Sequence, residues 1–295
     1  MRDDPIRQLG WRRRLRMVAT ALGLTRAGIW IPYRHADRLA PVDYPAVAEL
    51  FRRHEATFLT LLVAAEGHLD DLARFGGPPP APRLDQGWFP RLDLAVAYAL
   101  VRRRRPRTLV EIGCGHSTRV LARARVDGGL ATRHLCIDPA PRADIAALEV
   151  EHLPRRLEEV EDRVVAALGP GDVLFVDSSH LALPGSDVDR IFLRILPRLP
   201  AGVLVHVHDV FLPDPYPAAW RWRGYGEQSL LAAWLLAGGL EPLFSSHWIT
   251  TRCRERWQAS PLGALPRVED APECSLWAVL RTGGAQRAQK KVSGR

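Results

Sequence analysis

The spacing of apolar residues along the chain changes near residue 85. Before that point apolar positions recur at helical spacing, and residues 44–75 predict one or two helices with a buried face. Residues 11–24 form a basic amphipathic stretch, which is typical of a surface-packed helix and also of a helix on a membrane surface. Three adjacent prolines mark residues 76–82 as a linker. We therefore expect an N-terminal helical segment or lid over residues 1–85.

From residue 86 onward, strand-like and helix-like patterns alternate. Short apolar runs predict strands at 108–112, 133–137, near 150, 172–177 and 203–208. Helices are expected at 92–102, after Ser117, after Arg142, and at 157–168, 187–196 and 227–236. Two late runs, 242–249 and 275–281, predict a closing antiparallel pair. This alternation predicts a doubly wound α/β domain over residues 86–281, and the polar, basic tail 282–295 is expected to be disordered.

Composition removes several classes of function. The net charge of +8 suggests an acidic partner, but Lys290 and Lys291 are the sole lysines, and no nucleic-acid recognition signature accompanies the arginines. We therefore expect no nucleic-acid partner. No apolar run reaches the ~18 residues that span a membrane, and no secretory signal is evident, so a cytoplasmic protein without a membrane span is expected. The four cysteines match no zinc or disulfide spacing and are expected to be reduced.

The stretch from Gly113 to Gly115 carries the strongest local signal. A buried strand ends in Gly113, Cys114 and Gly115, and Ser117 lies where the next helix begins. A strand, a glycine turn and a helix start form a cradle for a nucleotide or nucleoside, in which free backbone N–H groups can hold an anion. The third glycine of the dinucleotide fingerprint is missing, and so is the G-K-[ST] of a phosphate-binding loop. Glu111, inside the strand, suits a ligand with an ammonium group, such as the methionine part of S-adenosylmethionine.

Acids and imidazoles gather where the predicted strands end. Asp138 lies 25 residues after Gly113, at the tip of the second strand, where an acid can bond ribose hydroxyls. The fourth strand ends in the sequence 177–180 (D-S-S-H) and the fifth in 206–209 (H-V-H-D). Because ligands bind at the carboxyl ends of parallel strands, these residues predict a site at one sheet edge. His206 is the exception, because it is expected to point between the sheet and a helix.

These motifs resemble a known family. Residues 110–118 look like motif I of the class I S-adenosylmethionine-dependent methyltransferases. Together with 177–180 and 206–209, the pattern closely resembles a bacterial family related to the metal-dependent O-methyltransferases. Further matching stretches are 31–34, 85–90, 185–188, 195–199 and 215–217. The resemblance implies a Rossmann-like seven-stranded sheet whose last strand is antiparallel.

The resemblance also implies the site residues. Around S-adenosylmethionine it places Glu111, Gly113, Gly115 and Asp138, to which we add Cys114, Ser117 and Asp177. In metal-dependent relatives an acid after strand 4 and an acidic pair after strand 5 hold a divalent cation such as Mg²⁺. The matching residues are Asp177, His208 and Asp209. An imidazole at 208 favours softer metals.

The chemistry expected of this site is methyl transfer to a hydroxyl. His180 is the candidate general base, since histidine titrates near neutral pH, and Asp177 is the second catalytic candidate. A backbone-bonding role for His180 stays open. Residues 213–226 form a long aromatic loop that, with Trp88, is expected to line the acceptor site.

Four hypotheses follow from the sequence. The leading one is an S-adenosylmethionine-dependent methyltransferase that acts on oxygen of a small-molecule or glycosyl-type acceptor. The others are an NAD-linked oxidoreductase, a non-catalytic cofactor-binding module, and a metal enzyme for hydrolysis or oxygenation that uses His206, His208 and Asp209.

Overall fold

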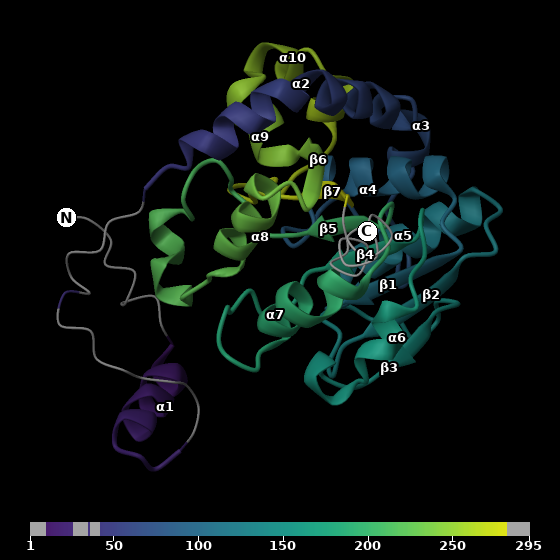
Figure 1. The fold of residues 1–295 in the computed structure, drawn as a ribbon. Coiled ribbons are helices and arrows are strands. Elements are labelled where there is room, and N and C mark those ends of the chain that lie inside the picture. Colours follow the sequence, from purple (N-terminus) through teal and green to yellow (C-terminus); the bar gives the residue numbers. More distant parts are fainter. Residues whose placement is uncertain (1–9, 26–34, 36–41, 282–295) are drawn as a thin grey trace, which may run out of the picture.

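A seven-stranded sheet forms the centre of the computed structural model, which describes residues 10–25, 35 and 42–281 (Figure 1). Its order is β3-β2-β1-β4-β5-β7-β6. The strands are β1 (Thr108–Ile112), β2 (Arg133–Ile137), β3 (Glu151–Leu153), β4 (Val173–Val176), β5 (Leu204–Val207), β6 (Leu240–Ser245) and β7 (Leu276–Leu280). β1 to β5 pair in parallel, and β7 is antiparallel to both of its neighbours. The expected doubly wound sheet with an antiparallel last strand is confirmed.

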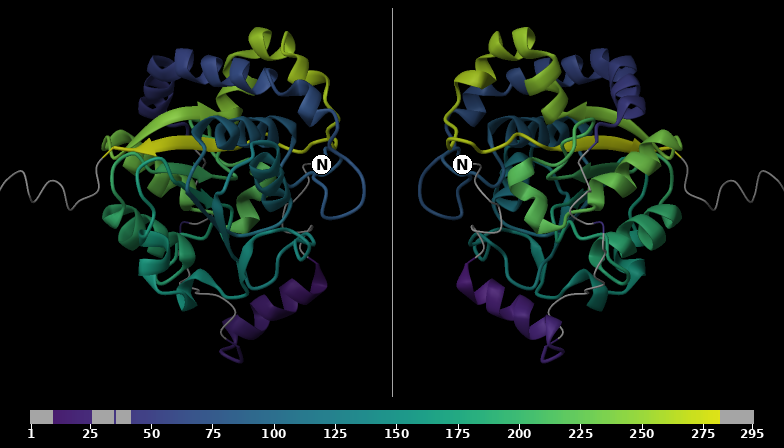
Figure 2. Two further views of the ribbon diagram at one scale, coloured as in Figure 1. Left: turned by 90° about the vertical axis from the view of Figure 1, so that its right-hand side faces the viewer. Right: turned by 90° about the vertical axis from the view of Figure 1, so that its left-hand side faces the viewer.

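Helices cover both faces of this sheet. They are α1 (Trp11–Ala21), α2 (Pro45–Glu66), α3 (Leu69–Leu72), α4 (Arg91–Arg104), α5 (His116–Asp127), α6 (Asp162–Ala166), α7 (Asp187–Arg190), α8 (Glu227–Leu236), α9 (Ser246–Arg252) and α10 (Arg254–Gln258). α4 packs against α5 and α2. The short helices α6 and α7 both contact the helical turn at 191–195, and α7 also contacts the one at 157–159. In both views of Figure 2, α2 and α1 lie at opposite ends of the molecule.

Three local predictions were wrong. The segment after Arg142 contains no helix up to residue 150, because the side chain of Asp144 bonds the Ala146 N–H in place of a helical carbonyl. The helix expected at 157–168 is a short 3₁₀ turn (Leu157–Glu159) followed by α6. The late strand expected at 242–249 stops at 245.

The end of β6 has a local cause. Ser245 accepts a hydrogen bond from the Trp248 N–H at 3.2 Å through its side chain, which caps the start of α9. The capping side chain therefore turns the chain from strand into helix. The tail 282–295 and the family-like stretch 31–34 lie outside the described residues.

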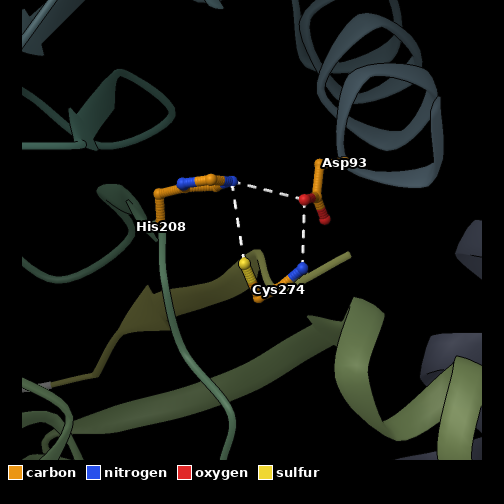
Figure 3. A group of neighbouring side chains, drawn as sticks. All are labelled: Asp93, His208 and Cys274. Atoms are coloured by element: carbon orange, nitrogen blue, oxygen red, sulfur yellow. Dashed lines mark hydrogen bonds and ion pairs between the residues drawn. The ribbon is translucent and has the colours of Figure 1, made fainter. Parts of the chain in front are cut away.

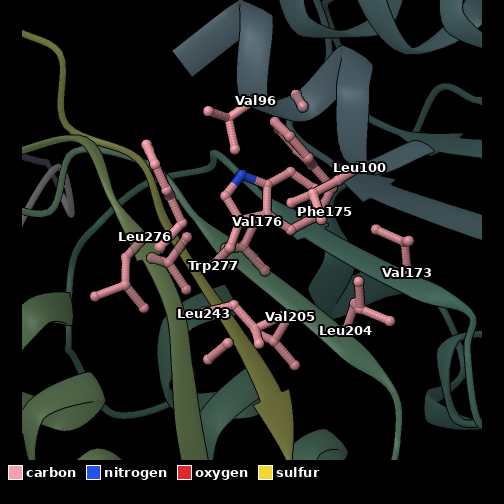
Figure 4. Packing of buried hydrophobic residues seen from close by; sticks show 14 of the residues in the cluster. Val96, Leu100, Val173, Phe175, Val176, Leu204, Val205, Leu243, Leu276 and Trp277 are labelled. Carbon is pink, nitrogen blue, oxygen red and sulfur yellow. The ribbon is translucent and has the colours of Figure 1, made fainter. Parts of the chain in front are cut away.

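One continuous core joins the sheet and the N-terminal helix α2. Inward-facing side chains of α2, among them Phe51 and Phe58, belong to the same buried cluster as the strands. Figure 4 shows the part of this core around Phe175 and Trp277. A division of the chain at residue 85 stays a prediction.

His206 is part of this core. Its imidazole stacks on Phe175 with ring centroids 3.7 Å apart, and its Nε2 lies 2.9 Å from the Ser275 hydroxyl. Burial, with the neighbouring His208, holds the pKa of His206 well below its ordinary value. The side chain is therefore a neutral packing element, in line with the expectation that it points into the space between the sheet and a helix.

Within the described residues, no helix is long and apolar enough to cross a membrane.

Candidate functional site

A cavity of about 1130 Å³ opens at the carboxyl edge of the parallel strands. Every site residue expected from the sequence lines it, except Glu111. These residues are Gly113, Cys114, Gly115, Ser117, Asp138, Asp177, His180, His208 and Asp209. As expected from the rule that parallel strands end at a common edge, these residues line one shared cavity.

Gly113 is required by packing between two strand ends. Its φ is +81°, and a Cβ at this position would lie 1.8 Å from the carbonyl oxygen of Asp177. Gly115 is less constrained, because a Cβ there would first meet the Cβ of Arg142, at 3.4 Å. The first glycine therefore lets the β1 turn contact the chain that follows β4.

The N–H groups of the glycine turn are already bonded within the protein. Gly113 donates to the carbonyl of Ile137 at 3.0 Å, Cys114 to the carboxylate of Asp138 at 2.7 Å, and Gly115 to the hydroxyl of Thr118 at 2.9 Å. The expectation that free N–H groups of this turn hold an anion is therefore wrong. The first turn of α5, whose N–H groups have no helical acceptor, is the remaining backbone donor at this edge.

Glu111 lies behind the turn and not in the cavity. Its side chain is fully buried, accepts a hydrogen bond from the Ser117 hydroxyl at 2.5 Å, and lies 3.1 Å from Nε2 of His134. A carboxylate so enclosed does not reach a ligand ammonium group, so the structure does not support that expected contact. His134 and Cys136 share a strand face with Glu111, because Glu111 pairs with Cys136.

The buried pair of Glu111 and His134 makes stability depend on pH. Burial alone would lower the pKa of His134, but its hydrogen bonds to Cys136 and Glu111 outweigh burial and raise the pKa to about 9. A raised pKa stabilises the fold below the unfolded value of 6.5, and this contribution disappears as the pH rises through about 9. We expect a loss of about 3 kcal/mol across this range.

Urea unfolding of the wild type and of His134→Gln at several pH values tests this expectation. Glutamine can still donate to Glu111 but does not titrate, so its curve should lack the decline. Parallel stability curves for the two proteins would contradict the assignment.

Asp138 both holds the backbone around it in place and lines the cavity. Its two carboxylate oxygens accept the N–H groups of Cys114 and Ala140, both at 2.7 Å. Each oxygen keeps a further lone pair, and the side chain lines the cavity at the tip of β2. The arrangement holds the carboxylate in one orientation, which suits recognition of a ribose diol.

Two carboxylates and two imidazoles lie together at the ends of β4 and β5. They belong to Asp177, Asp209, His180 and His208, and each imidazole lies near both carboxylates. Asp177 Oδ1 lies 3.4 Å from His180 Nε2 and 3.5 Å from His208 Nδ1. Asp209 closes the group, at 3.4 Å from each of the same two nitrogens. These separations exceed those of good hydrogen bonds, so the four side chains face a shared space without bonding one another tightly.

Each of these imidazoles meets a second, buried carboxylate on its other nitrogen. His180 Nδ1 lies 2.8 Å from Glu227, the first residue of α8, and His208 Nε2 lies 3.3 Å from Asp93 on α4. Both carboxylates are fully buried. Neither residue was predicted from the sequence. Asp93 carried a usable signal, because it is the one charged residue in the apolar stretch 92–101 of α4.

The thiol of Cys274 lies next to Asp93 and His208, and the donor atoms of these three side chains are close enough together to hold a metal ion (Figure 3). The two oxygens of Asp93 accept the N–H groups of Cys274 at 3.0 Å and of Ser275 at 2.9 Å. Asp93 therefore ties α4 to the start of β7 and holds His208 in place.

The carboxylates control the charge of the imidazoles. Burial alone would lower the pKa of His180, but the nearby carboxylates of Asp177, Glu227 and Asp209 raise it well above its ordinary value. Burial likewise opposes ionisation of Asp177, yet His208 and His180 hold its pKa far below the usual range. An ionised Asp177 and a positively charged His180 are the stable states near neutral pH.

The ligands expected for a divalent cation, Asp177, His208 and Asp209, do not bring three donor atoms as close together as Asp93, His208 and Cys274 do. Asp177, His208 and Asp209 offer two carboxylates and one imidazole toward the same space. Histidines that bind metals commonly bond a carboxylate through their other nitrogen, as His208 does with Asp93. Nitrogen in the set favours a transition metal over Mg²⁺.

Aromatic side chains and an arginine flank this group on the loop before α8. The Tyr225 ring lies 4.7 Å from that of His180, and the Arg223 guanidinium lies 3.8 Å from the Trp220 ring. Arg223 also reaches within 3.9 Å of Asp209. With Trp88 and Trp222, these residues form the outer wall of the cavity.

The central part of the chain matches a known protein family. A family model described as a methyltransferase domain matches residues 110–210. No curated protein matches the sequence.

Solved structures of methyltransferases are similar to the chain at low sequence identity. The S-adenosylhomocysteine-bound methyltransferase PaMTH1 of Podospora anserina shares 14% identity over 86% of this chain and 99% of its own, with a TM-score of 0.41. An O-methyltransferase from Bacillus cereus in complex with S-adenosylhomocysteine shares 18% over 84% and 95%, with a TM-score of 0.38. The O-methyltransferase TomG from Streptomyces achromogenes, involved in tomaymycin synthesis and bound to S-adenosylmethionine, shares 21% over 93% and 100%, with a TM-score of 0.37.

Proposed function

We propose that the chain is a class I, S-adenosylmethionine-dependent methyltransferase that methylates a hydroxyl group of a small-molecule acceptor, because a methyltransferase-domain model matches residues 110–210 and the sheet order is the one expected from the sequence. The observation that carries this proposal is the cluster of Asp177, His180, His208 and Asp209, which faces the same cavity as the glycine turn and Asp138. S-adenosylmethionine supplies a methyl group on a positively charged sulfur. The protein then has to hold the cofactor, orient the acceptor and accept its proton.

Asp138 and the start of α5 would hold the cofactor. Asp138 offers two carboxylate oxygens at the tip of β2, and Cys114, Gly115 and Ser117 line the cavity next to it. This surface can accept the hydroxyl groups of a ribose and surround the rest of an adenosine.

Truncating Asp138 should weaken the binding of S-adenosylhomocysteine. Hydrogen bonds to a charged group contribute about 1.5–3 kcal/mol, so Asp138→Ala should raise the Kd about 10- to 100-fold. Calorimetric titration measures this change. Asp144→Ala is the matched control, because Asp144 also accepts a backbone N–H two residues on but does not line the cavity. Equal affinities for the two variants would contradict the ribose assignment.

His180 would accept the proton of the hydroxyl through Nε2. Glu227 on Nδ1 fixes the orientation of the ring, and Nε2 faces the space between Asp177 and Asp209. Because the three carboxylates favour the charged imidazole, His180 has to be neutral before it can act as a base. A divalent cation on Asp177, His208 and Asp209 would supply positive charge that lowers the pKa of the acceptor hydroxyl.

The acceptor would lie between this cluster and the aromatic wall. Trp88, Trp220, Trp222 and Tyr225 offer flat apolar faces, which suit a ring-containing small molecule. In this proposal the helices before residue 85 cover the domain formed by residues 86–281.

Incubation of the full chain with labelled S-adenosylmethionine and panels of phenols and glycosides tests the proposal. Label on the oxygen of any of these compounds supports it, and transfer confined to amines or thiols would contradict the choice of oxygen.

A further inference from the structure

Helix α1 carries an exposed apolar stripe. Trp11, Leu15, Val18 and Leu22 recur at helical spacing, so they fall on one side of the helix. Each is between 55 and 68% exposed, and no residue of α1 is buried. A helix that packs on its own protein through an apolar face would have these side chains covered.

The opposite side of α1 faces the protein. At about 3.6 residues per turn, Arg13 lies across the helix from Trp11 and Val18. Its guanidinium lies 5.4 Å from the ring of Trp222 and lines the cavity. In Figures 1 and 2, α1 lies at the edge of the molecule, apart from the sheet. The expectation of a surface-packed helix is therefore wrong in one respect, because the apolar face is turned outward.

Charge decides which partner suits this stripe. Residues 10–25 contain Arg12, Arg13, Arg14 and Arg16 and no acidic residue. Pairing of two such helices from two copies of the chain would bring eight arginines together, which is unfavourable. A negatively charged lipid surface accommodates both features, since apolar side chains enter the boundary between headgroups and acyl chains while arginines meet lipid phosphates.

We propose that α1 docks on an anionic membrane surface through Trp11, Leu15, Val18 and Leu22. The helix lies in the plane of the surface and does not cross it. Because Arg13 and Trp222 both line the cavity, docking brings the cavity opening close to the lipid headgroups. This inference does not depend on which acceptor is methylated.

Co-sedimentation of the full chain with lipid vesicles tests the proposal. We expect binding to vesicles of phosphatidylcholine with phosphatidylglycerol, at least tenfold weaker binding to phosphatidylcholine alone, and release from the anionic vesicles at high salt. Leu15→Glu combined with Val18→Glu should reduce binding to the anionic vesicles at least tenfold.

A matched control separates the stripe from net charge. Val126→Glu combined with Leu193→Glu adds the same two charges at exposed apolar positions, Val126 on α5 and Leu193 before β5, and should bind vesicles as the wild type does. S-adenosylhomocysteine affinity reports that each variant is folded. Equal loss for both double variants would overturn the docking face. Sedimentation velocity gives a second test. If the wild type forms dimers and does not bind vesicles, and the Leu15 and Val18 double variant is a monomer, a second copy of the chain covers the stripe and the proposal is overturned.

Discussion

Replacing His180 with alanine should lower the rate of methyl transfer by about 10²- to 10⁴-fold, the range typical of a general base, and leave the affinity for S-adenosylhomocysteine unchanged. The imidazole lies 3.4 Å from both Asp177 and Asp209, and His180 is not one of the residues to which we assign the cofactor. Its loss therefore removes a proton acceptor without removing a cofactor contact. Single-turnover rates and calorimetric titration measure the two quantities separately.

Two further variants sharpen this test. His54→Ala, on α2 and outside the cavity, should change neither quantity. Glu227→Gln keeps a hydrogen-bond partner for Nδ1 but removes one of three carboxylates around His180, so the pKa of His180 should fall. The rising limb of its pH–rate profile should then lie at lower pH than in the wild type. A His180→Ala rate close to that of the wild type would refute the role of the base.

Replacing Gly113 with alanine should destabilise the protein by about 3 kcal/mol or more, because two separate costs add. A residue with a Cβ is strained at φ +81°, and the Cβ would overlap the Asp177 carbonyl. The chain is anchored at this residue, since the Asp177 N–H donates to the Ile112 carbonyl at 2.9 Å. Urea unfolding measures the change in the free energy of unfolding.

Gly115→Ala provides the comparison two residues away. Its φ of 165° is ordinary extended backbone, and its nearest contact is an arginine Cβ at 3.4 Å. We expect a cost of about 1 kcal/mol or less. Similar losses of stability in the two variants would show that the close approach of the β1 turn to Asp177 does not determine the need for glycine.

The fold was predictable because its main signals are local. Apolar runs such as 108–112 and 173–176 predict strands from their own residues and are strands in the structure, and their order gives the parallel sheet. Local signals failed where side chains competed for the backbone. The Asp144 side chain bonds a backbone N–H where a helix was expected, and the Ser245 cap turned a strand into a helix.

The site was predictable to the extent that strand ends defined it. Asp177, His180, His208 and Asp209 come directly after β4 or at the end of β5, and they meet as expected. Glu227 and Asp93 bond these histidines from elements 47 and 115 residues away along the chain, and no spacing rule connects them. The role expected of Glu111 failed for a related reason, because His134 on the neighbouring strand encloses its carboxylate.

Calorimetric titration of the full chain with S-adenosylhomocysteine and, separately, with NADH tests the central claim most directly. Saturable binding of S-adenosylhomocysteine with no detectable binding of NADH is the predicted result, since the turn at Gly113 lacks the dinucleotide fingerprint. Binding of NADH, or no heat from S-adenosylhomocysteine at millimolar concentration, would contradict the assignment of the cavity to S-adenosylmethionine.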